Sequence, residues 1–201
     1  QSLLPEHVMT KVLYPVPNSA KQNSFLSAEK YQTMYQHSIE SPDEFWQQQA
    51  NILDWYKAPT IIQNSNFAKD NLQIKWFEDG ELNVSYNCID RHLAKQAQQT
   101  AIIWEGDSPD IDKKISYQQL HDEVCRLANG LKKLGVNKGD RVAIYMPMVP
   151  EAAFAMLACT RIGAVHTVVF GGFSPEALKN RILDSDCRVI ITADEGVRGG
   201  K

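Results

Sequence analysis

The sequence has no long apolar run and no excess of charge of one sign. Its 201 residues contain no stretch of about 18 uncharged apolar residues, and the most apolar segment, residues 152–173, includes Arg161 and His166. With 21 Lys and Arg against 24 Asp and Glu, the formal net charge is −3. We therefore expect no membrane-spanning segment, and no nucleic acid or anionic membrane bound through a basic surface.

Cysteines are few and widely spaced. The four positions form no C-x-x-C pair, and no two histidines stand at zinc-ligand spacing, so the sequence predicts no metal site. Isolated thiols are typical of a reducing compartment. Residues 1–10 have no apolar stretch of the kind that a secretory signal needs. With 43% hydrophobic residues, the chain is expected to be a soluble, globular, cytoplasmic protein.

Three common enzyme motifs are also absent. The sequence contains no G-x-x-x-x-G-K-[ST], no G-x-G-x-x-G and no G-x-S-x-G pattern. It therefore shows no signature of a P-loop nucleotide site, a dinucleotide site or an α/β-hydrolase nucleophile.

Residues 1–99 are predicted to form an N-terminal helical and hairpin region. A helix is expected over residues 27–40, and a second from Ser41 to about Leu53. Ser41 would cap this second helix, with Glu44 as the reciprocal half of a capping box. A hairpin is expected further on.

The predicted hairpin pairs residues 74–77 with residues 82–84. The intervening Glu-Asp-Gly segment would form the turn, with Gly80 supplying a positive φ angle.

From residue 100 onward, short apolar runs alternate with amphipathic helices. The predicted strands are residues 101–104, 141–146, 166–170 and 188–192, and the predicted helices are residues 116–134, 150–163 and a segment from Ser174. Continuous branched aliphatic strands that alternate with helices indicate parallel pairing with helices on both faces. Residues 100–201 therefore predict the start of a doubly wound α/β domain, with a mainly parallel sheet, preceded by the helical and irregular region.

Three loops are candidates for ligand binding, because ligands bind beyond the carboxyl ends of such strands. They are residues 147–149, 171–173 and 193–201. Gly171 and Gly172 would let a ligand approach the backbone at a helix start, where N–H groups are free. The same pair also fits a simple tight turn.

The last four residues form the second candidate. Arg198 and Lys201 flank Gly199 and Gly200, an arrangement suited to gripping a phosphate group. An ordinary solvated loop also fits it. These residues alone indicate an α/β domain that binds a phosphorylated ligand.

Four longer blocks resemble the N-terminal part of the acetyl-coenzyme A synthetases, members of the acyl-adenylate-forming superfamily. They are residues 74–80, 87–93, 142–158 and 168–178, in the order that the family has. The resemblance implies a partial N-terminal domain of an adenylate-forming enzyme. In this family acetate attacks the α-phosphate of ATP bound with Mg²⁺, giving acetyl-adenylate and pyrophosphate, and the thiol of coenzyme A then displaces AMP. The implied partners are these small-molecule substrates.

The resemblance also assigns a role to the two glycine-containing loops. Phe170, Gly171 and Gly172 correspond to the loop beside the pantetheine and nucleotide portions of coenzyme A. The segment from Arg198 to Lys201 corresponds to the one whose cations meet the 3′-phosphate region. Where the family commonly has Arg, Lys201 keeps the charge but loses the planar fork.

The resemblance implies no catalytic residue in this chain. The family's phosphate loop, its acetate pocket and its adenylation lysine would all follow residue 201. We therefore expect the chain alone to lack acetate-dependent exchange between ATP and pyrophosphate. Two alternatives stay open: part of a propionyl- or other short-chain acyl-CoA synthetase, or a non-catalytic module that binds coenzyme A.

Overall fold

The structure is a computed structural model that describes residues 14–108 and 110–197. The chain divides into two compact units, Gln1–Asn51 and Ile52–Lys201. Of the predicted ligand-binding residues, Phe170, Gly171 and Gly172 are described. The segment from Arg198 to Lys201 lies outside the described residues.

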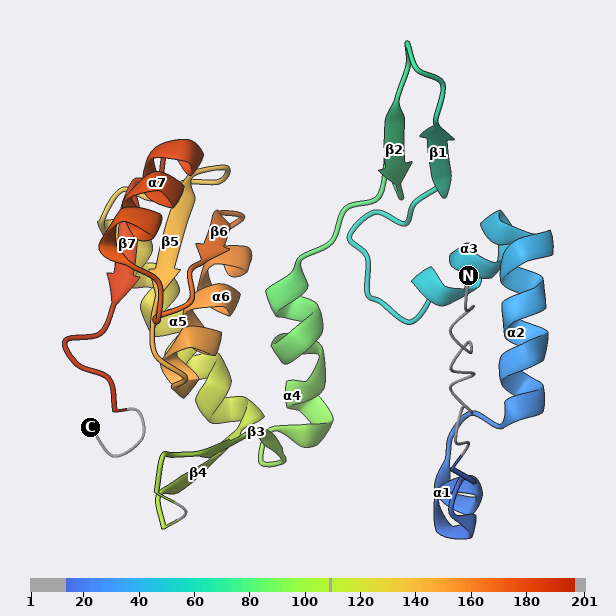
Figure 1. The fold of residues 1–201 in the computed structure, drawn as a ribbon, viewed down its shortest axis with the longest axis horizontal. Coiled ribbons are helices and arrows are strands. Elements are labelled where there is room, and N and C mark those ends of the chain that lie inside the picture. Colours follow the sequence, from blue (N-terminus) through green and yellow to red (C-terminus); the bar gives the residue numbers. More distant parts are fainter. Residues whose placement is uncertain (1–13, 109, 198–201) are drawn as a thin grey trace, which may run out of the picture. The chain divides into compact units, whose positions relative to one another are not determined.

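The described part of the first unit is helical (Figure 1). It contains α1 (Asn18–Asn23), α2 (Ala28–Glu40) and α3 (Pro42–Ala50). The start of α2 is as predicted, because the Ser27 hydroxyl accepts a hydrogen bond from the Lys30 N–H at 3.1 Å.

The predicted capping box at Ser41 is wrong. Ser41 makes no side-chain bond to α3, and its φ and ψ angles are −137° and 64°. The same residue closes α2, because its N–H donates to the His37 carbonyl. A residue held in this way does not adopt the extended conformation that a capping hydroxyl needs. The helix α3 also ends at Ala50, before the predicted Leu53.

The second unit begins with a small antiparallel sheet of β1 (Gln63–Asn66) and β2 (Gln73–Trp76). The residues of β2 pair with the preceding segment, Gln63 opposite Trp76, and the predicted pairing with residues 82–84 is wrong. The four residues of β1 are Gln, Asn, Ser and Asn, so no apolar pattern marks this strand in the sequence.

The glycine of the predicted turn has a different role. Phe77, and not Gly80, has the positive φ angle, at 50°. A Cβ atom on Gly80 would lie 2.7 Å from a ring carbon of Trp55. Gly80 is therefore required by the close packing of the Trp55 ring and not by backbone conformation.

The segment η1 (Tyr86–Asp90) and α4 (Arg91–Gln96) lead to a second antiparallel pair, β3 (Thr100–Glu105) and β4 (Asp112–Ser116). The prediction of a strand at residues 101–104 is confirmed, but β3 is not part of the parallel sheet. Its partner β4 is largely charged, so the sequence pattern does not reveal it.

The parallel sheet contains β5 (Arg141–Tyr145), β6 (Val165–Val168) and β7 (Val189–Thr192), with β5 in the centre. The helices α6 (Pro150–Arg161) and α7 (Pro175–Ser185) connect these strands (Figure 1). From β5 the chain crosses to β6 and then returns over β5 to β7. Right-handed crossovers in opposite directions place the two helices on opposite faces. The doubly wound α/β prediction is confirmed.

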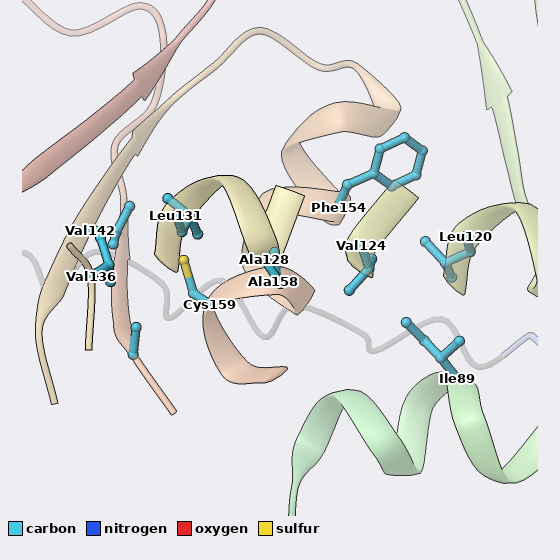
Figure 2. Packing of buried hydrophobic residues seen from close by; sticks show 11 residues of the cluster. Ile89, Leu120, Val124, Ala128, Leu131, Val136, Val142, Phe154, Ala158 and Cys159 are labelled. Carbon is cyan, nitrogen blue, oxygen red and sulfur yellow. The ribbon is translucent and has the colours of Figure 1, made fainter. Parts of the chain in front are cut away.

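The hydrophobic core lies between α5 (Tyr117–Lys133), α6 and the sheet (Figure 2). Its buried members on α5 repeat at intervals of three and four residues, which places them on one face of the helix: Leu120, Val124, Ala128 and Leu131. Leu134 is 70% exposed, because the helix ends there. Gly135 follows with a φ angle of 84°, the left-handed conformation expected after a helix end.

The beginning of α5 carries a complete capping box. The Ser116 hydroxyl accepts from the Gln119 N–H at 3.2 Å, and the Gln119 side chain accepts from the Ser116 N–H at 2.9 Å.

Ser116→Ala is expected to lower the free energy of unfolding by about 1 kcal/mol, measured by urea denaturation. Ser108→Ala, at an exposed position, is the control. Equal effects of the two substitutions would contradict a capping role for Ser116.

Candidate functional site

The three predicted loops line one half-open cavity of about 530 Å³. It lies where β5, β6 and β7 end, because the carboxyl ends of parallel strands meet at one edge of a sheet. Residues 146–148 follow β5, residues 170–172 follow β6, and residues 193–197 follow β7. The three candidate loops therefore meet at this edge of the sheet.

Gly171 and Gly172 allow close packing within the loop. Neither has a positive φ angle. A Cβ atom on Gly172 would lie 2.6 Å from Cε1 of Phe170, and one on Gly171 would lie 3.4 Å from the Met146 carbonyl oxygen. The Phe170 ring therefore rests against its own loop only because residue 172 has no side chain.

The Phe170 ring belongs to a short aromatic stack. Its centroid lies 5.9 Å from that of Phe173, with the ring planes at 86°. The Arg181 guanidinium lies 4.4 Å from the centroid of Phe173. Phe170 remains 52% exposed and lines the cavity. Such a ring offers a supported apolar surface for a flat base or an alkyl chain.

The beginning of α7, just after this loop, is partly occupied by its own cap. The Ser174 hydroxyl accepts from the Ala177 N–H at 3.3 Å. The expectation that this helix start offers free N–H groups is therefore wrong for Ala177, because its N–H already has a partner.

The described lining of the cavity is acidic. It includes Asp107, Asp194 and Glu195, and no Lys or Arg is present among the lining residues within 14–108 and 110–197. A phosphate group would be repelled by these carboxylates. The cations for a phosphorylated ligand therefore have to come from other residues, and the Arg198–Lys201 segment directly follows the loop after β7.

Two side chains that were not predicted support the loops around the cavity. The Tyr145 hydroxyl lies 3.0 Å from the Gly171 carbonyl oxygen and 3.2 Å from that of Phe173. The Trp104 Nε1–H of β3 donates to the Met148 carbonyl at 2.7 Å. Each side chain lies far in sequence from the loop it contacts, so no local pattern identifies it.

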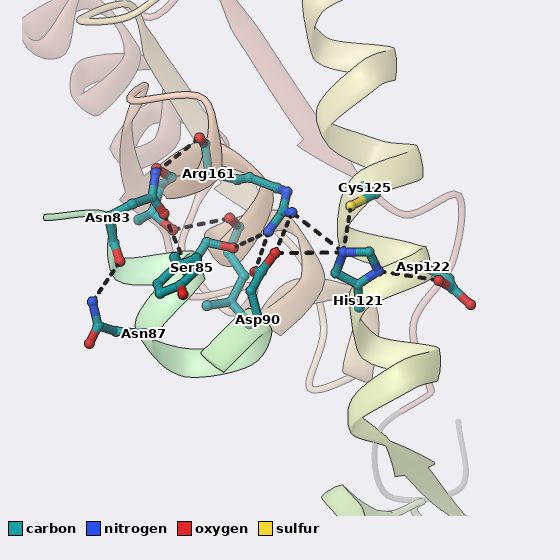
Figure 3. Close-up of polar contacts among 11 residues, drawn as sticks. Asn83, Ser85, Asn87, Asp90, His121, Asp122, Cys125 and Arg161 are labelled. Carbon is teal, nitrogen blue, oxygen red and sulfur yellow. Dashed lines mark hydrogen bonds and ion pairs between the residues drawn. The ribbon is translucent and has the colours of Figure 1, made fainter. Parts of the chain in front are cut away.

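A separate polar cluster joins η1 to α5 and α6 (Figure 3). The Arg161 guanidinium binds the Asp90 carboxylate through two hydrogen bonds of 2.7 and 2.8 Å. The His121 Nε2 atom lies 3.4 Å from Nη2 of Arg161 and 3.5 Å from the Cys125 sulfur. The two bonds from Arg161 lower the pKa of Asp90, which therefore remains ionised.

No helix within the described residues is long and apolar enough to cross a membrane.

Comparison with protein families agrees with this fold. The model of the AMP-binding enzymes matches residues 89–200. The chain belongs to this family. A second model, described as the acetyl-coenzyme A synthetase N-terminus, matches residues 31–88 of this AMP-binding chain. The resemblance noted from the four sequence blocks is confirmed.

Individual relatives are similar over nearly the whole AMP-binding chain. It is 60% identical over 193 residues to an acetyl-coenzyme A synthetase of Pseudoalteromonas atlantica, and 62% identical over 193 residues to one of Agrobacterium fabrum. Each match includes 96% of this chain and 30% of the relative. An acetyl-coenzyme A synthetase 2 of Pseudomonas aeruginosa is 58% identical over 190 residues. The chain therefore spans about 30% of the length of the curated relatives it matches.

The two matched segments are connected by hydrogen bonds. The Asn83 side chain, in the first segment, donates to the Thr160 and Arg161 carbonyls at 3.3 and 3.1 Å. Those carbonyls lie at the C-terminal end of α6, in the last turn of the helix. Within the second unit, this contact attaches the end of the first matched segment to α6 of the AMP-binding chain.

Proposed function

We propose that this chain is the N-terminal part of an acetate–CoA ligase. The complete enzyme forms acetyl-CoA, AMP and pyrophosphate from acetate, ATP and coenzyme A, through acetyl-adenylate. The observation that carries the proposal is the identity of about 60% to acetyl-coenzyme A synthetases over 193 residues. The names of these relatives favour acetate over propionate, and the isolated thiols favour a cytoplasmic location.

Within that enzyme, the cavity at the carboxyl edge of the sheet would bind coenzyme A. Phe170 offers an apolar surface, and Gly171 and Gly172 leave the adjacent backbone accessible. The acidic lining suits the neutral parts of the coenzyme better than its phosphates. The phosphates would instead be bound by Arg198 and Lys201, with Gly199 and Gly200 between them.

The remaining chemistry would use residues outside this chain. Mg²⁺ would accompany ATP and reduce the charge on its phosphates. Within residues 14–108 and 110–197, no group of three or more His, Cys, Asp or Glu side chains is arranged to hold a metal ion. We therefore assign no metal ligand among these residues, and the family resemblance assigns no catalytic residue to them. Residues 1–99 would form an N-terminal region, and residues 100–201 would begin the adenylate-forming domain.

Arg198→Ala in the full-length enzyme tests the assignment to coenzyme A. Loss of a charged phosphate contact is expected to raise the KM for coenzyme A by about 10- to 100-fold. Acetate-dependent exchange between ATP and pyrophosphate needs no coenzyme A, so its rate should be kept. Lys69→Ala, at an exposed position in the β1–β2 turn, is the matched charge-loss control.

The same assays test the proposed function itself. The unsubstituted full-length enzyme should form acetyl-CoA and AMP, and the 201-residue chain alone should catalyse no exchange. Absence of acetyl-CoA formation by the full-length enzyme would contradict the proposed function. If Arg198→Ala slowed the exchange between ATP and pyrophosphate as much as it slowed acetyl-CoA formation, Arg198 would instead act in the first step, the formation of acetyl-adenylate.

A further inference from the structure

We propose that Tyr145 is a positioning residue, whose hydroxyl holds the loop of residues 170–173 in the shape that coenzyme A requires. Tyr145 is the last residue of β5 and lines the cavity. The assignment of coenzyme A to this cavity rests on the proposed function. The contact between the Tyr145 hydroxyl and the loop is observed in the structure and does not depend on the proposed function.

The Tyr145 hydroxyl bonds to the loop just beyond the paired residues of β5 and β6. At the start of this loop, the Val169 N–H donates to the Ile144 carbonyl of β5 at 2.9 Å. One residue further along β5, the Tyr145 hydroxyl lies 3.0 Å from the Gly171 carbonyl oxygen and 3.2 Å from that of Phe173. One hydroxyl proton is thus shared between two acceptors on the loop. The side chain continues the attachment of the loop to the central strand.

The contact also determines how the loop presents its backbone. The described residues contain no cis peptide bond, and in a trans peptide the carbonyl and the following N–H point in opposite directions. Holding the Gly171 carbonyl toward Tyr145 therefore turns the Gly172 N–H away from it. The same loop carries Phe170, whose ring rests against Gly172. The hydroxyl of Tyr145 thereby fixes both the amide direction and the support of the ring.

The loop also has bonds within it and after it. The Phe173 N–H donates to the Phe170 carbonyl at 3.0 Å, and Ser174 caps α7. These bonds keep a local turn without attaching its carbonyls to β5. Loss of the Tyr145 hydroxyl is therefore expected to loosen the turn from the sheet and to leave the sheet intact.

Tyr145→Phe in the full-length enzyme tests this role, because the ring is kept and only the hydroxyl is lost. Chymotrypsin cleavage of the native protein after Phe170 is expected to become about fivefold faster, the effect of losing one ordinary hydrogen bond. The ratio of the KM for coenzyme A to the KM for ATP should also rise about fivefold. Tyr56→Phe removes an exposed hydroxyl elsewhere and should change neither quantity.

The outcomes separate this inference from the proposed function. If the unsubstituted enzyme forms acetyl-CoA and Tyr145→Phe leaves the KM ratio unchanged, the inference is overturned and the proposed function stands. If the unsubstituted enzyme forms no acetyl-CoA, the proposed function fails. Cleavage then decides alone: faster cleavage after Phe170 supports the positioning role of Tyr145, and unchanged cleavage overturns it.

Discussion

Replacing Arg161 by Met is expected to lower the free energy of unfolding by about 3 kcal/mol. Arg161 binds Asp90 with both terminal nitrogens, and the two side chains are only 25% and 19% exposed. Removing the guanidinium leaves the Asp90 carboxylate without its main partner in a partly dry environment. Breaking a buried ion pair in this way costs about 3–5 kcal/mol, and the remaining exposure places the effect at the lower end.

Arg126→Met is the matched control for this prediction. Arg126 also forms a short ion pair, with Glu123 at 2.6 Å, but its side chain is 71% exposed. Water screens such a pair, so the control should change the free energy of unfolding by less than about 1 kcal/mol. Urea denaturation measures both variants. If they proved equally stable, the Asp90–Arg161 pair would have no special structural role.

The same ion pair predicts a dependence of stability on pH. The hydrogen bonds from Arg161 lower the pKa of Asp90 in the folded protein below its value in the unfolded chain. The stabilisation is therefore complete above the unfolded pKa, about 4, and is lost as the pH falls through the lower folded pKa. The difference in the free energy of unfolding between the unsubstituted protein and Asp90→Asn should be present at pH 5, where Asp90 is ionised. Below about pH 4 it should shrink.

Asn87→Ala is expected to lower the free energy of unfolding by about 2–3 kcal/mol. The Asn87 side chain, in a residue that is only 8% exposed, binds both the N–H and the carbonyl of Asp54, at 2.8 and 2.9 Å. It also donates to the Asn83 carbonyl and accepts from Arg91. Alanine leaves the N–H and the carbonyl of Asp54 without the Asn87 side chain, and each buried unsatisfied group costs about 1–3 kcal/mol.

Asn71→Ala, at an exposed position, is the control for Asn87→Ala. It should change the free energy of unfolding by no more than about 0.5 kcal/mol. A similarly small effect of Asn87→Ala would mean that water replaces the lost side chain, and that residue 87 does not organise η1.

The elements that were predicted from the sequence are those with strong local signals. Ser116 marks the start of α5, Gly135 marks its end, and branched aliphatic runs mark the three parallel strands. The polar strands β1 and β4 were not predicted. Each is a strand because its backbone pairs with a neighbouring strand, and its side chains show no apolar pattern in the sequence. The predicted role of Gly80 in a turn was wrong, because a glycine is needed there to make room for the Trp55 ring, 25 positions earlier in the sequence.

In the candidate site, too, some features could be predicted from the sequence and others could not. The three loops could be predicted, because parallel strands bring their carboxyl ends to one edge. The Tyr145 contact joins residues 26 and 28 positions apart, and the Asp90–Arg161 pair joins residues 71 positions apart. Contacts of this kind depend on the packing of elements, so neither could be found before the fold was known.

Hydrogen exchange of the full-length enzyme, with and without coenzyme A, tests the central claim most directly. We expect coenzyme A to slow the exchange of amides in residues 146–148 and 170–172, at the carboxyl edge of the parallel sheet. Exchange in β1 and β2, outside this edge, should not change. Slower exchange elsewhere, with none at residues 146–148 and 170–172, would contradict the assignment of this cavity to coenzyme A.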